Sequence, residues 1–342
     1  MKQWQKIVGV IFGVIAVLFL AVCYLLMFYP QLFISADSEN TYKANGLHGN
    51  VSDLFFVDEN TGIALSSFLY PDKQDSVKVF RTTDAGHNWR PILEMPDCSY
   101  AFNAIKIGSC VFCAINKDSI FSLICVDALS GKYVISNDKL STLPMVFQYD
   151  NKLGYTANGV FYSTDSVFET TDSIGTYVKR PLNKGVAVIG NQFYGFIFDK
   201  DSRINRLYDF KNKNFVGNFS MPGDVSMIQT TDSSYVIFAV KNQRYLEMYD
   251  FDVVNNILTP KATYAYKIMQ PLRFDNEYVY TLVNEGPNAD NYLLTTDKSG
   301  QTKAIINLNE SNIKAYCLTD NLFYYYDQFR HIIVRLCISE TL

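Results

Sequence analysis

The sequence has few charged residues and few histidines. Asp, Glu, Lys and Arg make up 19% of its 342 residues, the formal net charge is −4, and no basic run occurs. Proteins that bind nucleic acid generally collect phosphates with clustered Lys and Arg, so the composition argues against such a partner. The histidines are His48, His87 and His331, each in a polar or turn segment. They show no His-x-x-x-His or comparable spacing, so we expect no metal and no cofactor.

The sequence also lacks helical and catalytic patterns. After about residue 40 we find no convincing amphipathic helix, no Gly-x-Ser-x-Gly elbow and no phosphate-binding glycine loop. It has instead 25 Phe and 24 Tyr, which favour strands because bulky side chains pack well on a pleated surface. Short runs of Val, Ile, Phe and Tyr alternate with Asn, Asp, Gly and Lys. This pattern predicts an all-β protein: a sandwich, a barrel or a propeller.

One long apolar run precedes these strands. Ile7 to Tyr29 comprises 23 residues without a charge, enough to cross a bilayer as a helix, and Lys2 and Lys6 lie before it. We expect residues 1–33 to be a cytoplasmic stub and a transmembrane signal anchor, with the remainder exported. A cleaved signal peptide is the alternative, but this run exceeds the ~7–15 apolar residues of a signal core.

The cysteines leave two interpretations open. Cys110 and Cys125 flank a short polar segment, and a turn at Lys117-Asp118 would place them directly opposite each other on adjacent strands. They are then a candidate disulfide, although buried free thiols are an equally good interpretation. The Cys110-x-x-Cys113 spacing has no second pair at zinc distance, so it does not indicate a metal.

A marker motif recurs along the chain. Strand-like runs over residues 51–96 form a meander that contains a Thr-Thr-Asp triplet ending at Asp84. Related triplets end 81 residues later at Asp165 and a further 132 residues on at Asp297. These intervals are close to two and three repeats of slightly more than forty residues each, which is the size of a four-stranded propeller blade. The chain after residue 40 therefore has room for about seven blades.

The first copy, Thr82-x-Asp84-x-Gly86-x-x-Trp89, resembles the Asp-box or BNR repeat. Asp can accept hydrogen bonds from the turn amides, Gly can take a positive φ, and Trp can fill the blade core. The segment 51–96 resembles blades of sialidase-like propellers and of photosystem II assembly factors. The other copies are degenerate: Ser163 and Asp165 lack the Gly and Trp, whereas Thr295, Asp297 and Gly300 have an extra residue and no Trp.

The resemblance implies a β-propeller over residues 50–342, with residues 34–49 as a linker. A propeller must cover its open edges, so we expect Thr41 to Ala44 to add the last strand to the C-terminal blade.

The same resemblance suggests two classes of function. A sialidase-like hydrolase or glycan-binding propeller would need an arginine triad, but the Arg-Ile-Pro motif is missing and Arg81 lies on the strand entering the Asp turn. We therefore favour a non-catalytic protein-binding module at a bacterial inner membrane, facing the periplasm. It would act as an envelope assembly factor or scaffold, or as an immunity protein against an exported toxin. Trp89, Tyr70 and the run from Phe323 to Tyr326 are candidate anchors, although core packing explains them as well.

Overall fold

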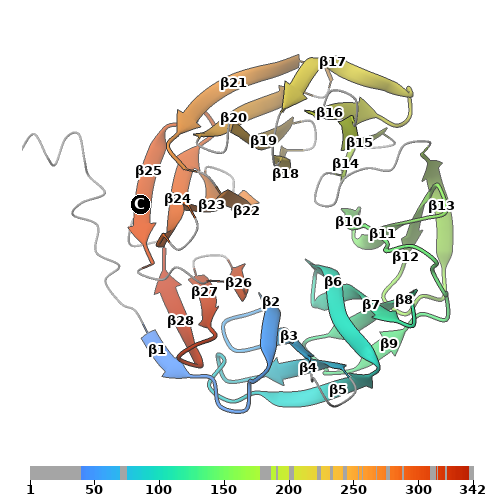
Figure 1. The fold of residues 1–342 in the computed structure, drawn as a ribbon, viewed down its shortest axis with the longest axis vertical. Coiled ribbons are helices and arrows are strands. Elements are labelled where there is room, and N and C mark those ends of the chain that lie inside the picture. The colour runs from blue at the N-terminus through green and yellow to red at the C-terminus, as the bar shows by residue number, and fades with distance from the viewer. Residues whose placement is uncertain are drawn as a thin grey trace, which may run out of the picture.

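The protein is an all-β propeller, as expected from the sequence. The computed structural model describes residues 40–338, apart from 70–74, 178–185, 190–191, 200–203, 222–224, 232–233, 242–244, 253, 256, 267, 275–277, 287–288, 309–312, 314 and 320–321. These described residues form seven four-stranded antiparallel sheets, which stand around a ring (Figure 1). The apolar run from Ile7 to Tyr29 lies outside them, and no helix within them has the length and hydropathy needed to cross a membrane.

Six sheets are simple meanders whose first strand lies nearest the ring axis and whose fourth lies at the rim (Figure 1). Their strands, sheet by sheet, are β2 (Asn50–Phe56), β3 (Gly62–Phe68), β4 (Ser76–Thr82) and β5 (Arg90–Pro96); β6 (Cys98–Ile107), β7 (Cys110–Lys117), β8 (Ile120–Asp127) and β9 (Tyr133–Ile135); β10 (Val146–Tyr149), β11 (Lys152–Ala157), β12 (Val160–Thr164) and β13 (Thr171–Thr176); β14 (Val186–Ile189), β15 (Gln192–Asp199), β16 (Ile204–Asp209) and β17 (Asn214–Met221); β18 (Val225–Thr231), β19 (Ser234–Lys241), β20 (Tyr245–Asp252) and β21 (Ile257–Tyr264); β22 (Ile268–Phe274), β23 (Tyr278–Asn284), β24 (Asn291–Asp297) and β25 (Thr302–Asn307).

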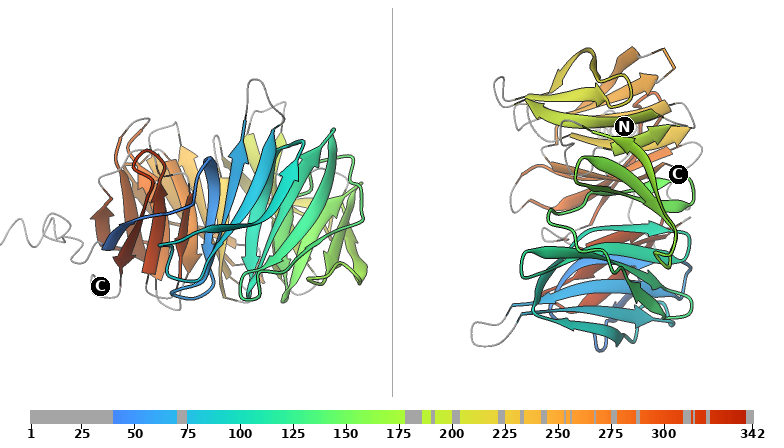
Figure 2. Two further views of the ribbon diagram at one scale, coloured as in Figure 1. Left: turned by 90° about the horizontal axis from the view of Figure 1, so that it is seen from below. Right: turned by 90° about the vertical axis from the view of Figure 1, so that its right-hand side faces the viewer.

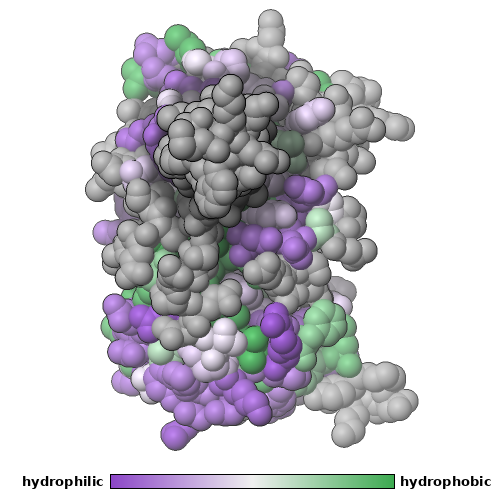
Figure 3. Space-filling model, turned by 90° about the vertical axis from the view of Figure 1, so that its left-hand side faces the viewer, coloured by the Kyte–Doolittle hydropathy of each residue, from purple (hydrophilic) through white to green (hydrophobic). Residues whose placement is uncertain are grey.

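The seventh sheet joins both ends of the described chain. Its order is β26 (Ala315–Leu318), β27 (Leu322–Asp327), β28 (Ile332–Cys337) and then β1 (Asn40–Lys43). β1 pairs antiparallel with β28, with Asn40 opposite Arg335 and Lys43 opposite Ile332. This is the closing strand predicted from the sequence. Among the described residues visible in Figure 3, many are hydrophilic, and the hydrophobic ones form a few separate patches.

The antiparallel order gives the disc two distinct faces. We call the end with the turns between second and third strands the hairpin face, and the end with the turns between third and fourth strands the Asp-turn face. β28 runs toward the Asp-turn face, so the last described residue, Ile338, lies there. Asn40 pairs near the same end of β28, so the described chain also enters from this face. In the left view of Figure 2 the sheets stand side by side, with the two faces at the upper and lower edges.

The core lies between neighbouring sheets, which explains the tyrosine-rich run of β27. All six residues of β27 are buried, although simple alternation would leave half of them facing outward. Both faces of this strand are covered: Tyr324 stacks on Phe56 of the β2–β5 sheet at 4.0 Å, and Tyr325 donates a hydrogen bond to the Leu308 carbonyl. Trp89 is only 3% exposed. These aromatics are therefore core residues, and Tyr70 lies outside the described residues.

The hairpin that carries Cys110 and Cys125 has a different register from the one we expected. Its turn is Asp118-Ser119, both with positive φ (52° and 64°), so Cys110 pairs with Asp127 and not with Cys125. The prediction of directly opposite cysteines is wrong by two residues, because two left-handed residues form the tight turn one position later. The two thiols are diagonal neighbours on one face, and both are free. Burial and the adjacent Cys110 raise the pKa of the Cys125 thiol.

Candidate functional site

The turn that resembles an Asp-box is built around two side chains. Asp84 Oδ1 accepts hydrogen bonds from the Thr82 hydroxyl (2.8 Å) and from the Asn88 amide (2.9 Å). The Gly86 amide donates to Thr82 Oγ1 at 3.1 Å, and Gly86 has a φ of +93°. The indole of Trp89 donates to the Gly86 carbonyl at 2.8 Å. Each residue of the motif therefore has a structural task in closing the turn.

The same kind of turn occurs where the third strand ends in all six meander sheets. The predicted aspartates Asp165 and Asp297 each accept amide hydrogen bonds from residues two and four positions later. The structure adds three aspartates that the sequence reading missed: Asp127, Asp209 and Asp252. The six positions are 38 to 45 residues apart along the chain, so a strict search for a third-strand Asp at this interval could have found them.

Asp84 and Asp297 are held in their charged form. At Asp84, burial alone would raise the pKa, but hydrogen bonds from Asn88 and Thr82 lower it below the ordinary value. At Asp297 the same competition, with hydrogen bonds from Ser299, Lys303 and Gln301, lowers the pKa to about 2. The Asp charge thus stabilises the turn from within at neutral pH, so we assign these residues a structural role.

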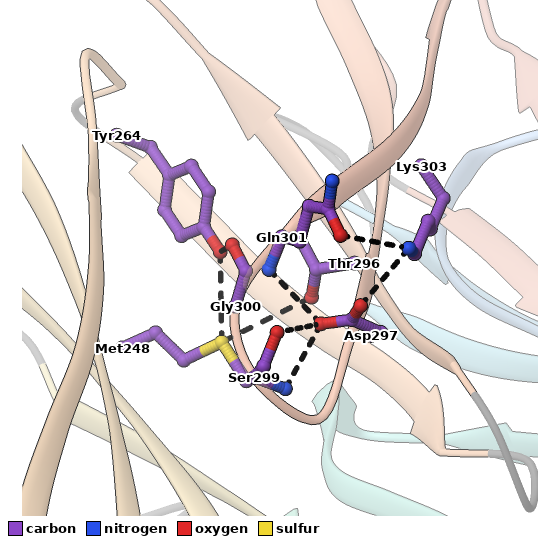
Figure 4. Close-up of polar contacts among 8 residues, drawn as sticks. All are labelled: Met248, Tyr264, Thr296, Asp297, Ser299, Gly300, Gln301 and Lys303. Carbon is purple, nitrogen blue, oxygen red and sulfur yellow. Dashed lines mark hydrogen bonds and ion pairs between the residues drawn. The ribbon is translucent and has the colours of Figure 1, made fainter.

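The Asp turns also join neighbouring sheets. Tyr42, on the rim strand β1, donates a hydrogen bond to the Ala85 carbonyl of the Asp84 turn. Tyr264, on the rim strand β21, donates to the Gly300 carbonyl of the Asp297 turn at 2.6 Å, as Figure 4 shows. Burial raises the pKa of both phenols to about 12, so both remain donors at neutral pH. In each case a tyrosine from the preceding sheet fixes the turn of the next sheet.

Two further Asp turns are also contacted by a residue of the preceding sheet. Arg81 of β4 donates to the carbonyls of Ala128 and Leu129, at 2.6 and 2.5 Å, in the turn after β8. Phe168, in the turn after β12, packs edge-on against Phe112 of β7 at 6.3 Å. The guanidinium of Arg81 is therefore bound to backbone carbonyls of the next sheet, which gives it a structural task in place of substrate binding.

A Tyr–Glu pair allows a test of the hydrolase hypothesis. Tyr249 donates a 2.6 Å hydrogen bond to Glu247, two residues away on the third strand β20. Burial, and then Glu247, raise the pKa of Tyr249, which makes the phenol a weaker nucleophile. The pair also lies away from the innermost strands around the axis. This geometry does not favour glycoside cleavage at the pair.

The histidines have neighbours that account for them structurally. His87 stacks on Tyr42 with ring centroids 3.9 Å apart, and His331 Nδ1 lies 2.8 Å from the Tyr326 hydroxyl. His48 packs edge-on against Phe68 and Phe80. Across the part of the chain that the structure describes, no group of three His, Cys, Asp or Glu residues could hold a metal ion.

The hairpin face carries the candidate binding surface. Five of its second-to-third-strand turns, each on a different sheet, expose a large apolar side chain in or beside the turn. These residues are Leu69, Ile120, Phe198, Tyr245 and Phe329, with exposed fractions between 41% and 76%. Tyr100, at the start of β6, adds an exposed ring near Phe102, which in turn packs edge-on against Phe121. No sequence pattern singled these residues out, because an exposed apolar residue beside a turn looks like any strand end.

Comparison with solved structures shows the fold. The chain is similar to a chain of a mitotic checkpoint complex (TM-score 0.59, 10% identity, covering 89% of this chain and 96% of that one). It is also similar to YCF48 bound to a D1 peptide (0.56, 10%, 89% and 98%) and to the β-propeller domain of the trilobed protease from Pyrococcus furiosus (0.50, 8%, 85% and 90%). No family model and no curated protein matches the sequence. Likenesses at this identity establish a β-propeller and nothing about its partner.

Proposed function

We propose that the chain is a membrane-anchored, extracytoplasmic propeller of seven blades that binds a protein without catalysing a reaction. Each four-stranded sheet is one blade, and Ile7 to Tyr29 is the transmembrane anchor. The uncharged length of this run and the preceding Lys2 and Lys6 support insertion with the propeller outside a bacterial inner membrane. The partner would be an envelope protein that is being assembled or an exported toxin that is being neutralised.

The observation that carries this proposal is the ring of exposed apolar side chains on the hairpin face. Phe329 is 76% exposed and Tyr245 is 47% exposed, and both stand at equivalent turns of different sheets. Protein interfaces use such side chains as anchors surrounded by polar contacts. The described chain enters and leaves at the other face, so this surface is open to a partner. Two structurally similar proteins are seen in a checkpoint complex and with a bound peptide, which supports the same use of the fold.

Site-specific photo-crosslinking in intact cells tests this proposal. A photoreactive residue replaces Phe329 or Tyr245 in the full-length chain, and Asn158, in the β11–β12 turn of the same face, serves as the matched control without an apolar side chain. We expect one protein adduct from the first two positions and much less from the control. Absence of adducts from both positions, in cells where the chain is at the membrane, would overturn this surface as the docking site.

A separate assay addresses catalysis. The full-length protein is incubated with sialosides and a glycan panel, and we expect no sugar release. Release that disappears when one acidic residue is replaced would reverse the assignment to a binding protein. A stoichiometric complex with the product of a neighbouring gene would identify the partner and separate an assembly role from toxin neutralisation.

A further inference from the structure

The Asp-turn face has its own set of exposed apolar side chains, separate from the surface proposed above. Leu129, Val167 and Val254 are 56%, 44% and 76% exposed. Each stands two residues after the aspartate of its turn. The three lie in the turns that follow β8, β12 and β20, on three different sheets. The three residues thus occupy equivalent turn positions on one face of the ring.

Hydrogen bonds hold these side chains at the tips of their turns. The Leu129 amide donates to Asp127 Oδ1 at 3.2 Å, and the Val167 amide donates to Asp165 Oδ1 at 3.1 Å. The Val254 amide likewise donates to the Asp252 carboxylate. Since the amide of each residue is fixed by the turn, its side chain cannot fold back into the core. Each tip therefore presents one apolar side chain beside polar neighbours such as Ser130, Glu169 and Asn255.

The route of the chain indicates what this face meets. The described chain enters at Asn40 on the Asp-turn face, and only ten residues separate Asn40 from the end of the apolar run at Tyr29. Ten extended residues span at most about 35 Å. An anchored propeller is therefore held with its Asp-turn face toward the bilayer. The tether joins the sheet that contains β1, and the three tips belong to sheets elsewhere around the ring (Figure 1).

The charges at the rim fit the same surface. Lys211 and Lys213, in the β16–β17 turn, are exposed and belong to the sheet between those of Val167 and Val254. Lysine side chains near a bilayer interact with lipid phosphates while their stems cover apolar surface. Acidic residues also lie on this face: Glu59 is in a first-to-second-strand turn closer to the axis, and the exposed Glu169 is in the same rim turn as Val167.

We propose that the propeller lies on the lipid surface through Leu129, Val167 and Val254, with its hairpin face pointing away from the membrane. The occupant of the Asp-turn face is the headgroup and upper acyl region of the bilayer that holds the anchor. This inference rests on the anchor of the proposed function. It assigns the two faces different partners: lipid on one and protein on the other.

Fluorescence quenching in nanodiscs tests this orientation. The full-length protein, with Trp4→Phe, is placed in nanodiscs whose lipids carry bromine in the upper acyl chain. Val254→Trp and Leu129→Trp place an indole on the Asp-turn face, and Phe329→Trp is the matched control because Phe329 and Val254 are both 76% exposed. Native Trp89 is buried and supplies an unquenched baseline. We expect several-fold stronger quenching for the first two variants than for the control.

The parent chain with native Trp4 reports the anchor independently, because Trp4 lies three residues before the apolar run. Quenching of Trp4 without quenching of the Val254→Trp and Leu129→Trp variants would overturn the lipid contact and leave the anchor intact. Loss of quenching at all three sites would overturn the anchor itself. Stronger quenching of Phe329→Trp than of Val254→Trp would show that the opposite face meets the membrane.

Discussion

Replacing Gly46 by alanine tests how the ring is closed. Gly46 lies between β1 and β2 with a φ of +82°, and a Cβ placed there would lie 2.4 Å from the carbonyl oxygen of Trp89. The adjacent Asn45 accepts a hydrogen bond from the Trp89 amide (2.8 Å) and donates one to the His87 carbonyl (3.0 Å). Alanine at this position must therefore push the closing segment away from the Asp84 turn.

The expected magnitude follows from these contacts. A left-handed alanine costs about 1–2 kcal/mol by itself, and each lost backbone hydrogen bond costs about 1 kcal/mol. Gly46→Ala should therefore lower the free energy of unfolding by about 3–4 kcal/mol. Gly108→Ala is the matched control, because Gly108 also has a positive φ (+60°) but nothing lies within 4 Å of its Cβ position. Gly108→Ala should lower the free energy of unfolding only by the cost of the left-handed alanine, about 1–2 kcal/mol.

The assay is denaturant unfolding of the full-length protein in detergent, followed by far-UV circular dichroism. The two variants are compared through the shift of the unfolding midpoint at an unchanged slope. Equal losses for Gly46→Ala and Gly108→Ala would refute the reasoning, because they would show that the closing segment is not held against Trp89. Hydrogen exchange of the Trp89 amide, which should accelerate only in Gly46→Ala, distinguishes local release from general destabilisation.

Three further predictions concern the turns and the thiols. Trp89→Phe keeps the aromatic packing but leaves the Gly86 carbonyl without its indole donor, so stability should fall by about 1–2 kcal/mol in the same unfolding assay; an unchanged midpoint would contradict this role. Asp297 has a folded pKa of about 2, below the ordinary value, so its contribution is present above about pH 4 and is lost as pH falls toward 2. The stability difference between the parent and Asp297→Asn should therefore shrink over that range in acid titrations, and a constant difference would refute the assignment. If the propeller is exported, Cys110 and Cys125 should become oxidised in the cell. Alkylation after unfolding without reductant should then find five free thiols among the seven cysteines of the parent and six in Cys110→Ser, whose Cys125 has no partner. Alkylation of all seven in the parent would show that the diagonal placement prevents the bond.

The architecture could be predicted because groups of strand-like runs and the Asp that marks a turn recur along the chain with the same spacing. The recurring Asp gave the blade length, and the need to cover an open edge predicted the pairing of β1 with β28. Half of the Asp turns were missed because the marker was a Thr-Asp triplet, whereas Asp127, Asp209 and Asp252 follow Val, Tyr and Phe. The structure shows that residues other than glycine take the left-handed conformation there, such as Phe168 (φ 57°) and Lys213 (φ 56°). The carboxylate accepting amide hydrogen bonds is the shared feature, and its partners are invisible in the sequence.

The contacts between sheets could not be predicted. Tyr42 and Tyr264 occupy rim strands of different sheets, and only the folded ring shows that both bind the next Asp turn. The register of the β7–β8 hairpin was also beyond the sequence, because Lys-Asp-Ser offers no glycine to fix which two residues form the turn. The exposed apolar residues of both faces could not be predicted either, since exposure beside a turn depends on how far that turn projects.

The position of the Thr-x-Asp-x-Gly-x-x-Trp turn has a physical explanation. β1 has only four residues, and it is the one strand of the described sheets that no turn connects to its pairing neighbour. Such a short strand needs support beyond its ladder with β28. The Asp84 turn supplies that support: Ala85 accepts the Tyr42 hydrogen bond, His87 stacks on the same ring, and Trp89 bonds to Asn45. The other five Asp turns lie beside rim strands that a turn connects to their pairing neighbours, and none of them has a Trp at the position of Trp89. The one turn with the full motif is therefore the turn that holds the closing strand in place.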